Sequence, residues 1–469
     1  MTDERISIPQ LSDDEQAALD RMWNELRQRT PRNVLRSSYY DGKHAVRQVG
    51  TVIPPQYYRL AITLGWSGKA VDLLARRVNL TGFTHGGVDL DAVGSGALWD
   101  ANHEGSEVSQ AITSGLIHGV SFLVTSAGRD GEPDGLVHAL DALSATGVWD
   151  RRQRRLSSAL EIGAWGEDGR PSSLTVHFPG LVVRCRRDAV KWDVERTAHP
   201  YGMPVEPLVH RPRTGREMGS SRITRPIMSL HDSALRTLIR MEGHQDIYSI
   251  PQLILLGADA SVLENADGSP KPAWQVALGR VFALPDDHER EGALARAEVK
   301  QFNAQSPEAH LASLNAYAKM FAREASLPDT AVAITDIANP TSAEAYDSSQ
   351  YELIAEAEGV QDEFSRPLVR THARLLAMAH GDPSLLPALE GLRPQWRNPR
   401  YLTRAAEADA GLKQLQAAPW LAETSVGLEL LGLSPAQIER ANAERRRSRG
   451  AAVLQRLAPP SPVSDDDDL

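Results

Sequence analysis

The sequence contains one cysteine, Cys185, in 469 residues. A single thiol excludes an internal disulfide and any zinc or iron–sulfur site built from several cysteines, and it is typical of a reducing compartment. We expect the Cys185 thiol to have no functional role. The sequence also lacks a run of about 18 apolar residues, and it begins with acidic residues rather than an apolar segment. We therefore expect neither a membrane span nor a standard secretion signal.

Basic residues are in the minority, because 51 Lys and Arg face 61 Asp and Glu and the net charge is −10. A protein that coats DNA by neutralising phosphates has the opposite balance, so any DNA contact should be local or weak. The chain is 41% hydrophobic and 24% charged, which is ordinary for folded proteins. At roughly 150 residues per domain, its length predicts about three domains or one large divided body.

The motifs of common enzyme classes are incomplete. A phosphate-binding loop at Gly65–Lys69 would need glycine at Thr63 and Ser or Thr at Ala70. The segments His103–Glu107 and His288–Gly292 begin like zinc-protease helices, but neither has the second histidine one turn later. We interpret both as solvated surface. The sequence therefore predicts no catalytic residue, no metal site and no cofactor.

The other polar candidates have simple structural interpretations. The sequence Gly94-Ser95-Gly96 lacks the glycine that a nucleophile elbow would have at Ala92, so it predicts a turn. Asp89 and Asp91 are expected to be hydrated turn residues, although two carboxylates could bind a cation. His118 and His231 are expected to be structural, and the basic run 151–155 is either a solvated turn or a phosphate contact.

Hydrophobic periodicity predicts an α+β protein. Ser12 and Glu15 form a capping box before a helix, and Gly119 should end another helix that starts near Glu107. Short β-rich runs between residues 121 and 209 predict an antiparallel sheet. Further on, the patterns predict helices over 221–248, 306–326, 341–379 and 405–416 and from 434, and a small module with strands at 251–257 and 275–284.

An ordered set of motifs resembles the portal (head–tail connector) proteins of tailed bacteriophages. The resemblance covers residues 35 to 450, and although each motif is also a generic cap or turn, the shared order makes it specific. The motifs are Tyr40–His44, Asn79–Phe83, Gly219-Ser220-Ser221-Arg222-Ile223, Pro251-Gln252, Ser306-Pro307-Glu308, Leu327-Pro328, Thr341–Tyr346 and Leu433–Arg440.

The resemblance implies a non-enzymatic ring of about twelve subunits at one capsid vertex. Double-stranded DNA would pass through its channel without sequence recognition, driven by the terminase large subunit. Other implied partners are a head–tail adaptor and the major capsid and scaffolding proteins, with no membrane. The ring would be assembled in the host cytoplasm and reside in the virion.

The resemblance also implies a domain map. Portals have a wing that contains antiparallel sheet, long stem helices, a small α/β clip that meets the motor or adaptor, and a helical crown. The implied wing covers 1–220, the stem helices 221–248 and 306–326, the clip 249–305, the tunnel loop 327–340, a long wing helix 341–380, the crown 381–450, and a disordered acidic tail 451–469.

Site residues follow from that map as hypotheses. The tunnel loop near the DNA would present Asp329, Thr330, Val332, Ile334, Thr335, Asp336 and Asn339. The stem would use Arg222, Arg225, Asp232, Arg236, Arg240 and Glu242 for the channel or for contacts between subunits. Trp274 and Gln275 would face the motor or adaptor, and Arg445, Arg446, Arg447 and Arg449 form a basic crown cluster that could equally complement a helix dipole.

Two other interpretations of the whole chain remain open. One is a different virion protein, such as a head–tail adaptor or minor capsid protein, although adaptors are usually much shorter. The other is a metal-dependent DNA-processing enzyme, which would need clustered carboxylates or histidines. The sequence shows only scattered ones.

Overall fold

The computed structural model describes residues 5–44, 62–188, 191–248, 252–256, 269, 298–302, 305–333, 349–400 and 404–457. The chain divides into two units, Met1–Pro399 and Arg400–Leu469, each with its own internal contacts. The fold mixes helices and sheets, as the periodicity predicts. Among the described helices, none combines the length and the hydropathy that a membrane span requires.

Capping residues define the ends of two N-terminal helices of the larger unit. Helix α1 (Asp13–Tyr40) begins with the predicted capping box, in which the Ser12 side chain and Glu15 each accept a hydrogen bond from the other's amide. Helices α2 (Trp66–Ala75), α3 (Ser95–Ala101) and α4 (Glu104–His118) follow. Gly119 ends α4 with a φ of 101°, which confirms the predicted stop.

Eight antiparallel strands between residues 120 and 209 confirm the predicted sheet region. One sheet has the order β3-β2-β9, and the other is a meander in the order β4 to β8. Their bounds are Val120–Ala127 (β2), Gly135–Leu140 (β3), Ala145–Asp150 (β4), Arg155–Trp165 (β5), Pro171–Phe178 (β6), Leu181–Asp188 (β7), Lys191–Ala198 (β8) and Val205–Val209 (β9). The apolar face of α1 packs on β5, β6 and β7.

A second, smaller strand pair joins segments that are far apart in the chain. Strand β1 (Leu80–Thr84) pairs antiparallel with β12 (Arg393–Trp396), which follows the short helix α10 (Leu385–Ala388). Because β12 is hydrogen-bonded to β1, residues 381–399 belong to the larger unit. The division at residue 399 does not coincide with the predicted crown boundary at residue 381, which stays a prediction.

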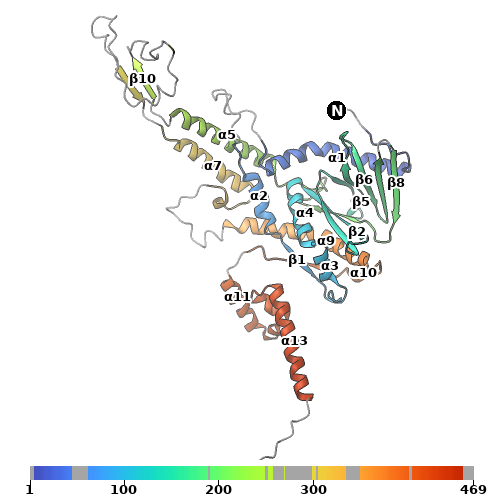
Figure 1. Ribbon diagram of the computed structural model, residues 1–469. Coiled ribbons are helices and arrows are strands. Elements are labelled where there is room, and N and C mark those ends of the chain that lie inside the picture. The colour runs from blue at the N-terminus through green and yellow to red at the C-terminus, as the bar shows by residue number, and fades with distance from the viewer. Residues whose placement is uncertain are drawn as a thin grey trace, which may run out of the picture. The chain divides into compact units, whose positions relative to one another are not determined.

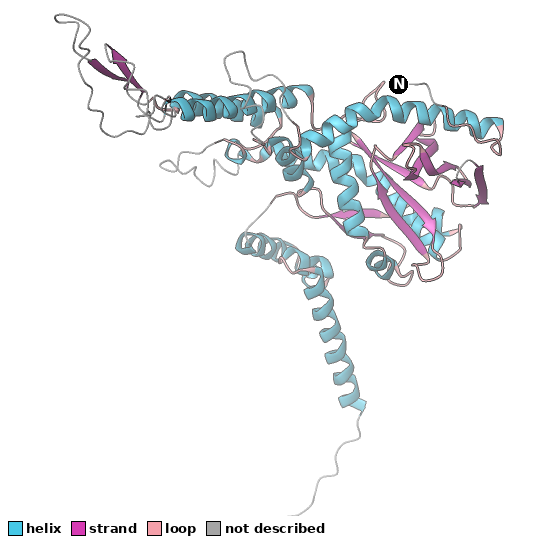
Figure 2. Ribbon diagram, turned by 45° about the horizontal axis from the view of Figure 1, so that its top comes forward, coloured by secondary structure: helices cyan, strands magenta, loops and turns pink. Residues whose placement is uncertain are grey.

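Helices α5 (Arg225–Tyr248) and α7 (Glu308–Glu324) lie side by side in both Figure 1 and Figure 2. Strands β10 (Gln252–Leu256) and β11 (Glu298–Phe302) pair antiparallel at the far end of these two helices (Figure 1). The predicted strand at 251–257 is confirmed, and the one at 275–284 lies outside the described residues. Helix α5 starts at Arg225 rather than Ser221, so Pro226 occupies the first turn, where its missing amide costs no hydrogen bond.

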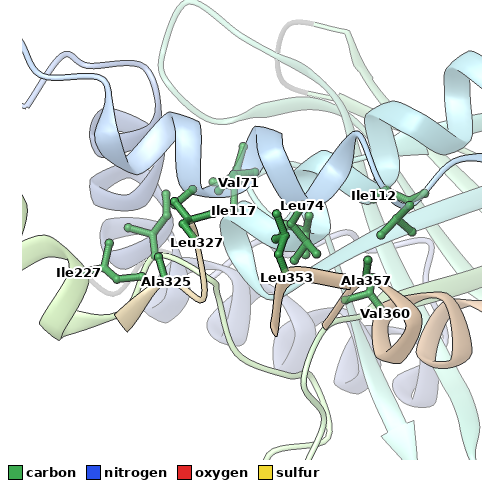
Figure 3. Packing of buried hydrophobic residues seen from close by; sticks show 14 of the residues in the cluster. Val71, Leu74, Ile112, Ile117, Ile227, Ala325, Leu327, Leu353, Ala357 and Val360 are labelled. Carbon is green, nitrogen blue, oxygen red and sulfur yellow. The ribbon is translucent and has the colours of Figure 1, made fainter. Parts of the chain in front are cut away.

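One hydrophobic core joins these helices to the rest of the larger unit. Figure 3 shows α2 residues packed against Ile112 and Ile117 of α4, Ile227 of α5 and the underlying helix α9 (Tyr351–Ala379). Ala325 and Leu327, just after α7, complete the cluster. Leu314, Ala318 and Phe321 form the buried face of α7, whereas Leu311 is exposed.

The smaller unit is helical, as predicted. It contains α11 (Arg404–Ala417), the 3-10 helix η5 (Pro419–Glu423), α12 (Ser425–Leu430) and α13 (Pro435–Leu457). Ser434 and Gln437 each accept a hydrogen bond from the other's amide at the start of α13, which confirms the predicted start of this helix. Helix α13 continues past residue 450, where the tail was predicted to begin, and residues 458–469 lie outside the described residues.

Candidate functional site

The path of the backbone that leads into α5 requires a glycine. Gly219 has a φ of +67°, and a Cβ atom there would lie 2.3 Å from the carbonyl oxygen of His210 and 2.6 Å from that of Gly119. Only glycine fits this close passage between backbones. Two residues further on, the Ser221 hydroxyl donates to Ile117 O, and the Arg222 amide donates to Leu116 O at 2.9 Å. The chain is therefore tied to the end of α4 before α5 begins.

The Arg222 side chain contacts three helices or their ends. Its Nε donates to Ala70 O of α2 at 2.6 Å, and its Nη2 donates to Ala325 O, just after α7, at 2.6 Å. Its Nη1 pairs with Glu356 of α9. The Arg222 side chain is 1% exposed. The prediction that Arg222 lies on a stem helix and faces the channel or a neighbouring subunit was therefore wrong, because the residue precedes α5 and its guanidinium is enclosed by this chain.

The charge of Glu356 is shared by two arginines. Arg211, whose side chain is 48% exposed, also pairs with it, and the Arg211 amide donates to Glu363 Oε2 at 3.0 Å. Burial lowers the pKa of Arg222, and the negative charge of Glu356 opposes that shift. The arginine thus satisfies two buried carbonyls and one carboxylate that is 11% exposed, at the point where α5 and α7 meet the body.

A second contact ties α5 to α1. The Tyr39 hydroxyl donates to Asp232 at 2.9 Å, and His44, whose ring stacks on Tyr39 at 4.0 Å, lies 3.4 Å from the same carboxylate. Burial, with help from the hydrogen bond to Asp232, raises the pKa of Tyr39. The neighbouring His231 is buried against Ser67 of α2 at 2.9 Å. Asp232, predicted to serve the channel or a subunit contact, therefore has partners within its own chain.

The remaining predicted stem residues lie towards the surface of the chain. Arg225, Arg240 and Glu242 are exposed, and Arg236 is half-buried with its Nη2 donating to Ser233 Oγ at 3.0 Å. Their roles in the channel or in contacts between subunits stay predictions.

The segment after α7 leads into the predicted tunnel loop. Phe321 contacts the Trp66 ring at 5.4 Å between centroids, and Leu327 is buried, so the start of the segment is anchored. A 3-10 turn, η4 (Asp329–Ala331), follows, with Asp329 and Thr330 exposed and Val332 packed against the core. Ile334, Thr335, Asp336 and Asn339 lie outside the described residues, as do Trp274, Gln275 and the predicted helix start at 341–346.

The basic cluster of the smaller unit does not end a helix. Arg445 to Arg449 lie within α13, which runs on to Leu457, so the proposed complement to a C-terminal dipole was wrong. Arg445 donates to Glu423 O at 3.0 Å and to Glu423 Oε2 at 3.2 Å. Arg446, Arg447 and Arg449 are exposed.

A buried Ser–His–Glu chain was missed by the sequence analysis. Ser95 Oγ lies 2.8 Å from His372 Nε2, and His372 Nδ1 lies 2.8 Å from Glu104 Oε2. The interpretation of Glu104 as solvated surface was wrong, since it is 1% exposed. The order resembles a hydrolase triad, but Ser95 is also buried and Phe83 stacks on His372 at 4.2 Å. These hydrogen bonds link α3, α4 and α9, and because Ser95 and His372 are 277 positions apart in the sequence, no local pattern signals the contact.

The other polar residues singled out in the sequence have the structural roles that were expected of them. Asp89 accepts hydrogen bonds from the amides of Asp91 and Ala92 in a turn, and residues 151–154 form a turn. His118 is buried near Ser37 at 3.0 Å. Burial raises the pKa of the Cys185 thiol to about 12. Within the described ranges, no three His, Cys, Asp or Glu side chains are grouped so that they could bind a metal.

Comparison with known proteins shows which family the sequence matches. The model of the family described as "Phage portal protein, SPP1 Gp6-like" matches residues 19–449. The chain is 26% identical over 397 residues to the portal protein of Mycobacterium phage L5, covering 80% of this chain and 77% of the relative. It is 26% identical over 424 residues to that of Mycobacterium phage D29, covering 87% and 83%.

Solved structures give weaker likenesses. The chain is similar to one in the virion of a native gene transfer agent particle, with 16% identity and a TM-score of 0.41, covering 79% of this chain and 90% of the other. A chain from the neck of that particle, computed with C12 symmetry, gives 17% identity and a TM-score of 0.42 with the same coverage.

Proposed function

The chain belongs to the family of SPP1 Gp6-like phage portal proteins, and from that premise we propose that its subunits close into a ring at one capsid vertex and form the conduit for the viral genome. The family match over residues 19–449 carries this proposal. Portal proteins are structural components of the virion. Membership therefore disfavours the two alternatives, a head–tail adaptor or minor capsid protein and a DNA-processing enzyme.

The helix pair is proposed as the stem of the ring. Helices α5 and α7 share one core with the body, and the strand pair β10–β11 lies at their far end, which supports the assignment of 249–305 to the clip. The buried contacts of Arg222 would transmit force between the stem and the body, because α2, α7 and α9 all meet its guanidinium. The sheets would belong to the wing, and the helices from residue 404 to the crown.

The segment 327–340 is proposed as the tunnel loop. Its first residues are anchored by Leu327 and η4, so a chain leaving this point starts from a fixed position at the base of α7. A conduit must let DNA slide, and each basic contact with phosphate adds affinity and hence friction. Asp329 and Asp336, repeated around a ring, would repel the phosphates, whereas Val332, Ile334 and Thr335 would offer contact without sequence preference.

Energy for packaging would come from the terminase large subunit, since the sequence has no complete phosphate-binding loop. The clip would meet this motor first and a head–tail adaptor later, with Trp274 and Gln275 at that interface. The major capsid and scaffolding proteins would surround the ring at the vertex, and assembly would take place in the host cytoplasm.

The first test is the native mass of the purified chain together with negative-stain imaging. Twelve copies of the 51.3 kDa chain predict a closed ring of about 620 kDa with a central hole. A chain that stays at 51.3 kDa, even when scaffolding protein is supplied, would contradict the ring.

The second test concerns the tunnel loop. Deletion of residues 329–339 should leave ring assembly intact and reduce the DNA packaged or retained by particles. The matched control replaces Asp329 and Asp336 by asparagine, which keeps the loop length and removes the charges. Normal DNA filling in the deletion variant would contradict the assignment of this loop.

A further inference from the structure

One face of α1 contributes three arginines to a cavity inside the larger unit. Arg21, Arg29 and Arg32 follow one another at helical spacing, so their side chains leave the same side of the helix. Together with strand β4, the turn after it and the segment 215–219, this face lines a cavity of about 580 Å³. All of its lining residues belong to the larger unit. Five arginines are among them, namely Arg21, Arg29, Arg32, Arg151 and Arg216.

The segment 215–219 is held in place by its backbone. The Arg216 amide donates to Arg213 O at 2.8 Å, and the Gly219 amide donates to Arg216 O at 3.1 Å. Gly219 itself passes between two carbonyl groups that leave no room for a Cβ atom. Arg216 therefore projects from a fixed turn, so a ligand that binds its guanidinium has little backbone to order.

Only part of the positive charge in the cavity is neutralised. Glu25 pairs with Arg29 at 2.5 Å, and Glu217 pairs with Arg151 at 2.7 Å. These are the two carboxylates of the lining, so the five arginines keep an excess of three positive charges. The arginines that form no ion pair with any described residue are Arg21, Arg32 and Arg216, and all three are exposed to solvent.

The basic residues also repel one another. Partial burial, and then the charges of Arg29 and Arg216, lower the pKa of Arg32. Burial, and then the charges of Arg32 and Arg216, lower the pKa of Arg36, one turn further along α1, to about 10. An anion in the cavity would oppose these shifts, because a nearby opposite charge favours the charged form of each group.

A buried polar atom in the same wall has no partner. Thr146 of β4 lines the cavity and is 2% exposed, and its hydroxyl makes no hydrogen bond to any described residue. Buried polar atoms nearly always have a partner, so we expect an occupant of the cavity that accepts a hydrogen bond. A water molecule would satisfy the hydroxyl but would leave the charge unbalanced, whereas an anion satisfies both.

Phosphate oxygens suit this arrangement. The guanidinium fork matches the geometry of phosphate, and a hydroxyl also donates to it. Each phosphate group carries a charge of about −1.5 to −2 at pH 7, so two linked groups balance an excess of three positive charges. A cube of 580 Å³ has an edge of about 8 Å, whereas the major groove of a DNA duplex alone is about 12 Å wide. The cavity can therefore enclose a small anion but not a duplex.

We propose that this cavity binds a small multivalent phosphate anion, with Arg32 and Arg216 as its main ligands and the Thr146 hydroxyl as a further donor. The anion would join α1, β4 and the segment 215–219. The same chemistry comes from free pyrophosphate or from the phosphate chain of a nucleotide, and the test distinguishes the two. The proposal goes beyond the conduit function, and its test requires neither a ring nor packaged DNA, so the two can fail independently.

The test is calorimetric titration of the purified full chain with inorganic pyrophosphate at low salt. We expect saturable binding that weakens as the salt concentration rises, because exposed charges are screened. The melting temperature should rise with pyrophosphate concentration, since the ligand binds the folded chain. A parallel titration uses adenosine triphosphate. Binding at least as tight as that of pyrophosphate identifies a nucleotide as the source of the phosphate, and weaker binding identifies the free anion.

Neutral variants test the two arginines. Arg32→Gln combined with Arg216→Gln should weaken pyrophosphate binding at least about tenfold, because two charge-assisted hydrogen bonds are lost. Without phosphate, this double variant should melt no lower than the unmodified chain, since repulsion in the cavity is relieved. The matched control, Arg129→Gln, removes one charge from the exposed β2–β3 turn and should leave the affinity unchanged. Circular dichroism establishes that each variant folds, and the single change Arg216→Gln replaces a double variant that does not.

The Thr146→Val variant separates a binding role of the hydroxyl from a structural one. Valine keeps the shape of the side chain and removes its donor. We expect pyrophosphate to bind at least about threefold more weakly, because one hydrogen bond is lost. The melting temperature without ligand should stay the same or rise, because no hydroxyl is then buried without a partner. A lower melting temperature with unchanged affinity would contradict the contact between Thr146 and the anion.

Three further results would overturn the proposal. The first is the absence of saturable pyrophosphate binding at low salt. The second is an equal loss of affinity in the Arg129→Gln control. The third is displacement of pyrophosphate by a short DNA duplex at an equal concentration of phosphate groups, which would assign the arginines to the nucleic-acid backbone instead of a small anion.

Discussion

Replacement of Arg222 by methionine should destabilise the junction between the helix pair and the body. Methionine keeps much of the apolar volume but leaves Ala70 O and Ala325 O without their donor, and it leaves the exposed Arg211 as the arginine partner of Glu356. Removal of one partner from a buried ion pair costs about 3–5 kcal/mol. Because each 1.36 kcal/mol is a factor of ten, we expect amide exchange in α5, α7 and α9 to accelerate roughly 150- to 5,000-fold.

The assay is hydrogen exchange of the full chain followed by mass spectrometry. Peptides from the five-stranded sheet serve as an internal reference, because that sheet packs on α1 in a separate cluster. The control is Arg211→Met, which removes the other partner of Glu356. Since the Arg211 side chain is 48% exposed, its ion pair should contribute less than about 1 kcal/mol.

A double variant separates the ion pair from packing. Arg222→Met combined with Glu356→Met should be less destabilised than Arg222→Met alone, because no carboxylate is left buried without its partner. Equal effects of Arg222→Met and Arg211→Met, or a loss below about 1 kcal/mol for Arg222→Met, would refute the role given to the buried guanidinium.

Three further predictions follow from single positions. Gly219→Ala should lower the free energy of unfolding by at least about 2 kcal/mol, because a Cβ would lie 2.3 Å from a carbonyl oxygen, whereas Gly202→Ala, with a positive φ but open space, should cost only about 1 kcal/mol in the same denaturation assay. Burial lowers the pKa of His231 from 6.5 to about 4, so the unfolded chain takes up this proton first and stability should fall by up to about 3 kcal/mol as the pH drops from 6.5 to 4. His231→Gln should flatten that part of the pH–stability curve, and an unchanged slope would refute the assignment. Cys185, whose pKa is raised to about 12 by burial, should react with iodoacetamide only after unfolding, and stoichiometric labelling of the native chain within minutes would contradict its burial.

The sequence determined features that depend on neighbours along the chain. Ser12 and Glu15 predicted the start of α1, and Gly119 predicted the end of α4, because caps use atoms within one turn. Alternating apolar residues predicted antiparallel strands between 121 and 209. The ordered motifs predicted the portal family, which the family match confirms.

Only the tertiary structure decided which charged side chains are covered by other elements and which meet solvent. Periodicity places Arg222 and Glu104 near helix starts, where a charged residue is expected to meet solvent. Their partners, Glu356 and His372, lie more than a hundred residues away, and no local signal marks them. A charge is buried only when distant groups supply its hydrogen bonds, so its burial is a property of the assembled core.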